Sequence, residues 1–151
     1  MNLDQYKEII NFAIAGEIEA QEFYQDAAAK INVPYLKDMF EKFAKEEKSH
    51  EKILQGILVK DTIKRYFNES TDYKVAETVE TPRLSTNMKP ADAIALAMKK
   101  EEEAMKQYTD LAEACLDPNQ KKVFLDLASM ERGHKLKMEK AFVDIGYAEL
   151  W

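Results

Sequence analysis

Glu131-Arg132-Gly133-His134 places a carboxylate three residues before an imidazole, inside a segment whose apolar residues recur with helical spacing. The chain has two histidines, and the other one, His50, follows Glu47 at the same distance. Residues three apart on a helix lie on one face, one turn from each other. Each Glu-x-x-His pair can therefore present two metal-ligating side chains together. We interpret the two pairs as the halves of a dinuclear metal site.

An internal repeat relates the two pairs. When the chain is shifted by 84 residues, positions 17–50 align with positions 101–134 without a gap, and twelve of the 34 positions are identical. The identical pairs are Glu17/Glu101, Glu19/Glu103, Ala20/Ala104, Tyr24/Tyr108, Asp26/Asp110, Ala28/Ala112, Pro34/Pro118, Lys37/Lys121, Phe40/Phe124, Ala44/Ala128, Glu47/Glu131 and His50/His134. Two segments of common pattern are expected to pack about a pseudo-two-fold axis, so that each half places its ligands opposite those of the other.

Four helices are predicted because apolar residues recur in steps of three and four along most of the chain. They cover residues from about 3 to 31, from 34 to the low sixties, from 90 to about 115, and from 118 to 145. Pro34, Pro90 and Pro118 each suit the first turn of a helix, and Asp117 is a suitable N-cap. The short loops after the first and third helices require antiparallel hairpins. The sequence therefore predicts an all-α four-helix bundle of two hairpins.

Residues from about 61 to 89 do not continue the helical pattern. Residues 68–72 are turn-like, and residues 73–84 have the composition of an extended or irregular segment. This stretch is far longer than a hairpin loop, so we predict a long crossover that returns along the bundle. The alternative is a linker between two small domains, but neither hairpin could bury its apolar face alone. We therefore expect one domain over residues 1–151.

The spacing also predicts the depth of four glutamates. Glu17 and Glu47 lie equally far from the first predicted turn, and Glu101 and Glu131 lie equally far from the second. Positions equally far from a hairpin's turn lie at one height, which at a rise of about 1.5 Å per residue is roughly 20 Å from each turn. Four carboxylates and both imidazoles should therefore meet in one layer near the middle of the bundle.

Four carboxylates in one buried layer need positive charge, because an isolated buried carboxylate costs several kcal/mol. The predicted core faces carry no Lys or Arg that could pair with them. Two metal ions would supply the charge, and carboxylate oxygens with one imidazole per ion suit iron or manganese. We predict six ligands: Glu47 and Glu131 bridge the ions, Glu17 and Glu101 are terminal, and His50 and His134 complete one ion each.

Tyr24 and Tyr108 occupy equivalent positions of the repeat, seven residues after Glu17 and Glu101. They are either ordinary core aromatics or hydroxyl donors to the bridging carboxylates. Their equivalence in the repeat favours the second interpretation. Tyr24 and Tyr108 are therefore candidate functional residues beside the six ligands.

Composition and charge argue against several other classes. The net charge is −6 and no Lys/Arg cluster stands out, so nucleic acids and membrane surfaces are not expected partners. The single cysteine, Cys115, cannot form an intrachain disulfide or a cysteine-based metal site. No stretch resembles a signal peptide or a membrane span, so we expect a cytoplasmic protein. The apolar residues 147–151 are expected to pack on the bundle or on a second subunit, in a homodimer.

The motifs resemble those of the ferritin-like superfamily and, within it, the rubrerythrin family, over all four predicted helices. The resemblance rests on Glu17 with Tyr24, Glu47-x-x-His50, Glu101 with Tyr108, and Glu131-x-x-His134. It implies a ferritin-like bundle with a non-haem centre of two iron ions. Manganese or a mixed-metal pair is the alternative. Such a centre reacts with hydrogen peroxide or dioxygen. The implied function is that of an oxidoreductase in oxidative-stress defence.

The sequence departs from the rubrerythrin pattern in two places. Rubrerythrins usually carry a rubredoxin-like domain with four cysteines, whereas this sequence has one, so the resemblance implies an external electron-donor protein. They also carry an additional Glu one turn after the third-helix ligand, where this chain has Ala104. The remaining six ligands are equally similar to those of bacterioferritins, which use them as a ferroxidase site in an iron-storage shell. Iron storage is therefore the alternative function, and a metal-stabilised bundle without turnover is a third.

Overall fold

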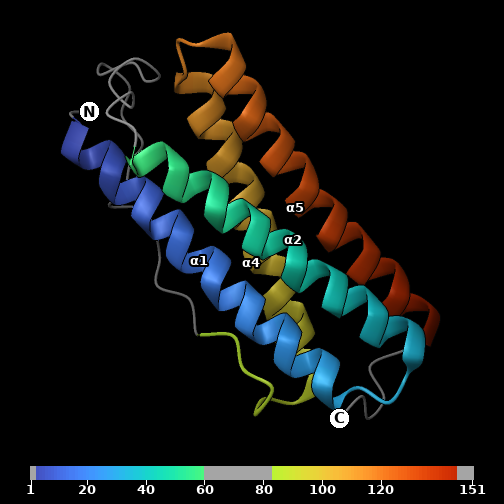
Figure 1. The fold of residues 1–151 in the computed structure, drawn as a ribbon. Helices are drawn as coiled ribbons and strands as arrows, with labels where there is room; N and C mark the ends of the chain where they lie inside the picture. Colours follow the sequence, from blue (N-terminus) through green and yellow to red (C-terminus); the bar gives the residue numbers. More distant parts are fainter. Residues whose placement is uncertain (1–2, 60–82, 146–151) are drawn as a thin grey trace.

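The described part of the chain, residues 3–59 and 83–145 of this computed structural model, forms four helices. They are α1 (Leu3–Lys30), α2 (Pro34–Val59), α4 (Pro90–Ala114) and α5 (Pro118–Ile145), and they pack as a bundle (Figure 1). The predicted all-α class and the predicted starts of the helices are confirmed. The apolar residues 147–151, which are expected to pack on the bundle or on a second subunit, lie outside the described residues.

Short loops and fixed backbone angles determine where the helices begin. Proline occupies the first position of α2, α4 and α5, where its missing N–H is not needed. At the start of α2, the carbonyl of Val33 accepts a hydrogen bond from the backbone N–H of Lys37 at 3.0 Å. At the start of α5, the Asp117 carboxylate accepts from the backbone N–H groups of Asn119 at 2.7 Å and Gln120 at 3.2 Å. The predicted N-cap is therefore confirmed.

The end of α4 differs slightly from the prediction. The helix ends at Ala114, and Cys115 has extended backbone angles of φ −68° and ψ 132° while its N–H donates to the carbonyl of Ala112 at 3.2 Å. Helices usually end before the residue that precedes a proline, and Pro118 follows closely. Cys115 thus lies in the turn and not on the core face of α4, although it still packs against the apolar core.

The helices form two antiparallel hairpins, because α1 packs mainly on α2 and α4 packs mainly on α5 (Figure 1). Helix α2 ends where α1 begins, whereas α4 begins at the opposite end of the bundle, among the last residues of α1. The chain between α2 and α4 has to reach from one end of the bundle to the other, as predicted. Most of this connection, residues 60–82, lies outside the described residues, including the predicted turn at 68–72.

The last part of the connection lies against α1. Arg83 forms an ion pair with Glu22 at 2.5 Å, and the backbone N–H of Leu84 donates to Glu19 at 2.7 Å. Further along, Lys30 donates to the hydroxyl of Thr86 at 2.7 Å. These contacts attach residues 83–86 to the second half of α1 and so fix the end of the bundle at which α4 begins.

Two apolar clusters fill the bundle and leave a polar layer between them. The cluster at the turn between α1 and α2 includes Phe23, Phe40, Ile94 and Met138, and the cluster at the other end includes Ile10, Leu54, Leu111 and Phe124. Between the clusters, each helix turns glutamate or histidine side chains inward. Within residues 3–59 and 83–145, none of the helices has an apolar stretch of the length that crossing a membrane requires.

Candidate metal centre

All six predicted ligands lie in the layer between the two apolar clusters. The most exposed of them, Glu101 and His50, are only 4% exposed, and Glu47, Glu131 and His134 are 1% exposed. Each of the four helices contributes, because the core face of every helix carries a glutamate at this height, and α2 and α5 add a histidine one turn later. The structure thus brings the two halves of the repeat together as the spacing predicts.

The donors form two groups that share two members. Glu17, Glu47, His50 and Glu131 make one group, and Glu47, Glu101, Glu131 and His134 make the other. In each group, one ligand atom per residue can be chosen such that all of them lie within 4.8 Å of one another. Glu47 and Glu131, which were predicted to bridge the ions, are the two members that the groups share.

These spacings fit two octahedrally coordinated ions. Donors at about 2.0–2.1 Å from one ion lie about 3 Å apart when adjacent and about 4.2 Å apart when opposite. The Nδ1 atom of His50 lies 2.8 Å from Glu131 and 3.6 Å from Glu17, and the Nδ1 atom of His134 lies 2.7 Å from Glu47 and 3.7 Å from Glu101. The donor chemistry, oxygen with one imidazole nitrogen per group, suits iron or manganese. The residues therefore fit a dinuclear metal centre.

Several donor atoms of the cluster have no hydrogen-bond partner among the described residues. They are Glu17 Oε2, Glu47 Oε1, Glu101 Oε2 and His134 Nδ1. The contact between Glu47 Oε1 and His134 Nδ1 is short, at 2.7 Å, but its angles are not those of a hydrogen bond. Buried polar atoms are almost always paired, since an unpaired one costs about 1–3 kcal/mol. Ligand atoms of a metal ion have this arrangement when the ion itself is not included: they converge on one point and have no protein partner.

Burial and mutual repulsion dominate the electrostatics of the shared carboxylates. Burial raises the pKa of Glu47 well above the ordinary value of 4.5, and the charge of Glu101 raises it further. The pKa of Glu131 is raised well above 4.5 for the same two reasons, burial and then Glu101. In the protein without metal, both shifts favour the protonated forms of these groups, and metal ions would replace the protons.

The pKa values of two other groups, Glu17 and His134, are shifted by their neighbours in the cluster. Burial acts to raise the pKa of Glu17, but the polar contacts with Glu47 and His50 outweigh it, so the pKa is lowered. Burial acts to lower the pKa of His134, but the nearby carboxylate of Glu101, 3.7 Å from Nδ1, outweighs it, so the pKa is raised. In both cases the polar neighbours within the cluster outweigh the effect of burial.

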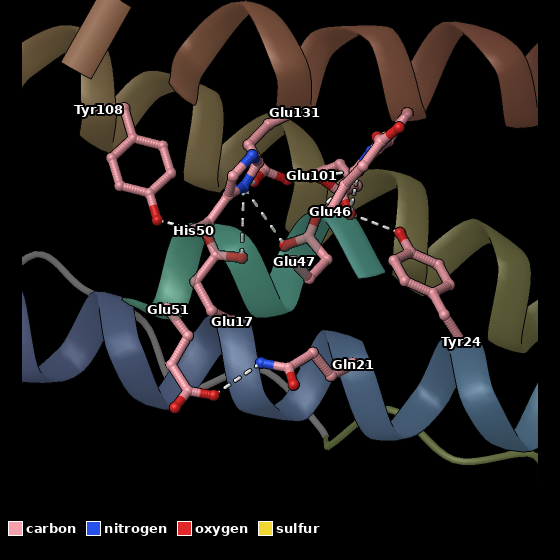
Figure 2. A network of polar contacts seen from close by, with 11 residues as sticks. Glu17, Gln21, Tyr24, Glu46, Glu47, His50, Glu51, Glu101, Tyr108 and Glu131 are labelled. Carbon is pink, nitrogen blue, oxygen red and sulfur yellow. Dashed lines mark hydrogen bonds and ion pairs between the residues drawn. The ribbon is translucent and has the colours of Figure 1, made fainter. Parts of the chain in front are cut away.

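Tyr24 and Tyr108 point to the cluster from opposite sides along the bundle (Figure 2). Their hydroxyls donate hydrogen bonds to carboxylates, as the favoured interpretation holds, but not to the bridging pair. Tyr24 of α1 donates to Glu101 of α4, and Tyr108 of α4 donates to Glu17 of α1. The prediction of bridging partners is wrong because each tyrosine lies two turns beyond the glutamate of its own helix and meets the terminal carboxylate of the other hairpin.

The sequence argument missed the side chains around His134. Its Nε2 atom lies 2.5 Å from Glu46 Oε2, and the ring of Phe43 packs on the imidazole with 4.2 Å between centroids. The buried amide of Gln21 also donates to Glu51 at 2.9 Å beside the cluster (Figure 2). Glu46 could have been found from its place four residues before His50, but it has no equivalent in the repeat and adjoins a stretch of exposed charges.

The fold and the donor set together define the ferritin-like class: four helices in two hairpins, with a buried carboxylate–histidine layer at mid-height. Comparison with known proteins agrees. The chain matches the Rubrerythrin family over residues 8–142. It therefore belongs to the rubrerythrin family, and its buried glutamates and histidines have the arrangement of a binuclear metal site.

Two solved structures are similar to this chain. A hypothetical protein from Pyrococcus furiosus is 32% identical, with a TM-score of 0.69, over 89% of this chain and 86% of that one. A protein from Thermotoga maritima, described as a ferritin-like di-iron carboxylate protein, is 17% identical, with a TM-score of 0.65, over 87% of this chain and 90% of that one. The second likeness shows the shared fold. No curated protein matches the chain.

Proposed function

We propose that this protein is a non-haem di-iron oxidoreductase that reduces hydrogen peroxide, with an external protein as electron donor. The observation that supports the proposal is the buried layer itself, in which two overlapping groups of donors hold unpartnered atoms in the middle of the core. When bound, two redox-active metal ions would supply the two electrons that break the O–O bond of hydrogen peroxide, which takes up two protons and leaves as two water molecules. Manganese or a mixed pair would satisfy the same donors.

The residues of the chain have distinct tasks in this proposal. Glu47 and Glu131 belong to both donor groups and would lie between the two metal ions. Burial and the charge of Glu101 raise both pKa values, so added positive charge would favour the ionised forms of these carboxylates. Tyr24 and Tyr108 keep their protons, because burial and then the charges of nearby carboxylates raise both pKa values well above 10. Their hydroxyls can therefore orient Glu101 and Glu17 at any physiological pH.

Apolar clusters lie on both sides of the layer, and its six predicted ligands are at most 4% exposed. A small neutral oxidant such as hydrogen peroxide can enter such a layer at lower cost than an ion, because a neutral molecule loses less hydration free energy on burial. Electrons cannot come from a four-cysteine iron site of this sequence, which has one cysteine. A separate donor protein in oxidative-stress defence is therefore part of the proposal.

Rapid mixing of the metal-loaded protein with each oxidant tests this function. Protein loaded with two Fe(II) per chain under anaerobic conditions is mixed with hydrogen peroxide or with dioxygen, and oxidation is followed by absorbance. We expect faster oxidation by peroxide, with two electrons consumed per peroxide. A variant with Glu47→Gln and Glu131→Gln serves as the control without a site. Faster oxidation by dioxygen would contradict the proposal.

Iron storage is the competing function, since six ligands of this kind also suit a ferroxidase site and Ala104 takes the place of the additional rubrerythrin carboxylate. The two functions differ in how much iron each chain takes up and in assembly size. We propose a homodimer, which sedimentation velocity can measure. A large shell that takes up many Fe(II) per chain would establish storage instead.

A further inference from the structure

The two imidazoles of the layer have unequal surroundings. His134 is held at one ring nitrogen and on one ring face: its Nε2 lies 2.5 Å from Glu46, and the Phe43 ring packs on it at 4.2 Å. Its Nδ1, which has no hydrogen-bond partner among the described residues, faces the carboxylates of the layer. Glu46 is 20% exposed, and Lys42, its other charged neighbour, is 3.9 Å away and 66% exposed. An exposed pair of that kind contributes little, so Glu46 remains available to His134.

The repeat shows what the surroundings of His50 lack. The position equivalent to Glu46 is Met130, and the position equivalent to Phe43 is Leu127. Met130 is 41% exposed and carries no carboxylate. Among residues 3–59 and 83–145, the carboxylates near His50 all face its Nδ1 atom, at 2.8 to 3.9 Å. The half of the layer around His50 therefore has no counterpart of the Glu46 contact in the described structure.

The Glu46 contact has a chemical consequence for a ligating imidazole. A neutral imidazole has one N–H and one lone pair, so it can bind a cation through Nδ1 only if the proton is on Nε2. A carboxylate that accepts from Nε2–H fixes this tautomer and the ring orientation, and it makes Nδ1 a stronger donor. For metal sites in general, loss of such a partner costs about 10–100-fold in affinity.

We propose that Glu46 makes the two metal positions unequal, so that the position of Glu101 and His134 binds its ion more tightly than the position of Glu17 and His50. This inference rests on the proposed metal site and goes beyond it, because it assigns a positioning residue and an order of occupation. The repeat makes the ligands of the two positions alike, and Glu46 distinguishes them. The tight position fills first, and the weaker one is the position at which an ion is more easily exchanged.

Half-site variants measure the two positions separately. Glu17→Ala removes a ligand from the position of His50 and keeps the position of His134 intact, whereas Glu101→Ala does the reverse. Each variant is titrated with Co²⁺ in competition with a coloured chelator. We expect the Glu17→Ala protein to bind Co²⁺ more tightly. Adding Glu46→Ala should lower the Co²⁺ affinity of the Glu17→Ala protein by about 10–100-fold. It should leave the Co²⁺ affinity of the Glu101→Ala protein unchanged. Glu46→Gln, which keeps an acceptor without the charge, should have a smaller effect.

Two further variants complete the design. Glu41→Gln removes an exposed carboxylate from the same helix and should change neither affinity. Met130→Glu, combined with Glu101→Ala, introduces the missing carboxylate and should tighten Co²⁺ binding at the position of His50. Equal affinities in the two half-site proteins, or an equal loss in both on Glu46→Ala, would overturn the inference. Absence of Co²⁺ binding in the unmutated protein would instead refute the metal site itself.

Discussion

A protein with Glu47→Gln and Glu131→Gln is expected to lose both metal ions and, without metal, to melt at a higher temperature than the unmutated protein. The two carboxylates belong to both donor groups, so their loss removes ligands from both positions at once. Without metal, they are buried groups whose pKa values are raised by burial and by the charge of Glu101. Glutamine has nearly the same volume and helix propensity, and it needs neither a proton nor a buried charge in the folded state.

The expected size of the stabilisation follows from the raised pKa values. Near neutral pH, folding has to protonate such a carboxyl group or bury its charge, and each pKa unit by which the value is raised costs about 1.4 kcal/mol. In a domain of this size, each kcal/mol corresponds to about 2–4 °C, so about 2 kcal/mol would raise the melting temperature by about 4–8 °C. Calorimetry of the metal-free proteins and elemental analysis of the loaded ones give the two readouts.

A matched control separates loss of the site from loss of negative charge. Glu41→Gln with Glu103→Gln removes two exposed carboxylates and should leave both metal content and melting temperature nearly unchanged. A doubly substituted site that kept two metal ions would disprove the role of the shared carboxylates. A lower melting temperature without metal would show that these carboxylates stabilise the bundle by themselves.

The second large effect is the stabilisation of the protein by bound metal. We expect this stabilisation to increase as the pH rises from 5 to 7.5. In the metal-free protein, the raised pKa values of Glu47 and Glu131 mean that the native state holds protons that the unfolded chain has lost above its ordinary value of 4.5. Stability therefore falls as pH rises through this window. His134, whose pKa is also raised, acts in the same direction above 6.5. The lowered pKa of Glu17 acts oppositely, but only below 4.5.

Metal binding has the opposite pH dependence. Ligands must lose their protons before they bind, so metal affinity rises with pH while the metal-free protein becomes less stable. At metal concentrations of 100 to 1,000 times the dissociation constant, one bound ion contributes about 2.7–4.1 kcal/mol. With a sensitivity of about 2–4 °C per kcal/mol, a metal-dependent increase of about 10 °C is expected near neutral pH.

Thermal unfolding with metal and with chelator, at pH 5, 6 and 7.5, checks this dependence. The difference between the two melting temperatures should widen at each step. The protein with Glu47→Gln and Glu131→Gln should show little difference at any pH. A difference that stayed constant or narrowed as the pH rose would mean that the stabilising ions bind elsewhere than at these carboxylates.

The ligand layer could be predicted from the sequence because it depends on separations along the chain. The interval from Glu17 to Glu47 equals that from Glu101 to Glu131, and each hairpin has a short loop at its midpoint. Height within an antiparallel pair follows directly from such distances. The repeat then predicts that the two hairpins face each other, and the buried cluster of the structure has this arrangement.

Contacts between the two hairpins could not be predicted from separations along the chain. The partners of Tyr24 and Tyr108 depend on how α1 packs on α4, and the spacing within one helix says nothing about that packing. Glu46 breaks the repeat, so an argument from symmetry passes over it. The apolar periodicity places Cys115 in the third predicted helix, because periodicity does not show where a backbone turns toward a proline.

The layer also explains a compromise between stability and function. Two apolar clusters stabilise the ends of the bundle, while the middle carries four carboxylates that would be more stable as apolar residues. Among residues 3–59 and 83–145, buried carboxylates occur at this one height, where all four helices contribute donors. Metal ions relieve the repulsion, so folding and metal binding should be strongly coupled.

An anomalous difference map from crystals grown with iron or manganese tests the metal centre most directly. We predict two peaks per chain, about 3.5–4 Å apart as in other two-metal sites. Glu47 and Glu131 should lie between the peaks, with Glu17 and His50 on one ion and Glu101 and His134 on the other. A single peak, or peaks only at exposed carboxylates, would contradict a dinuclear centre built by the two Glu-x-x-His pairs.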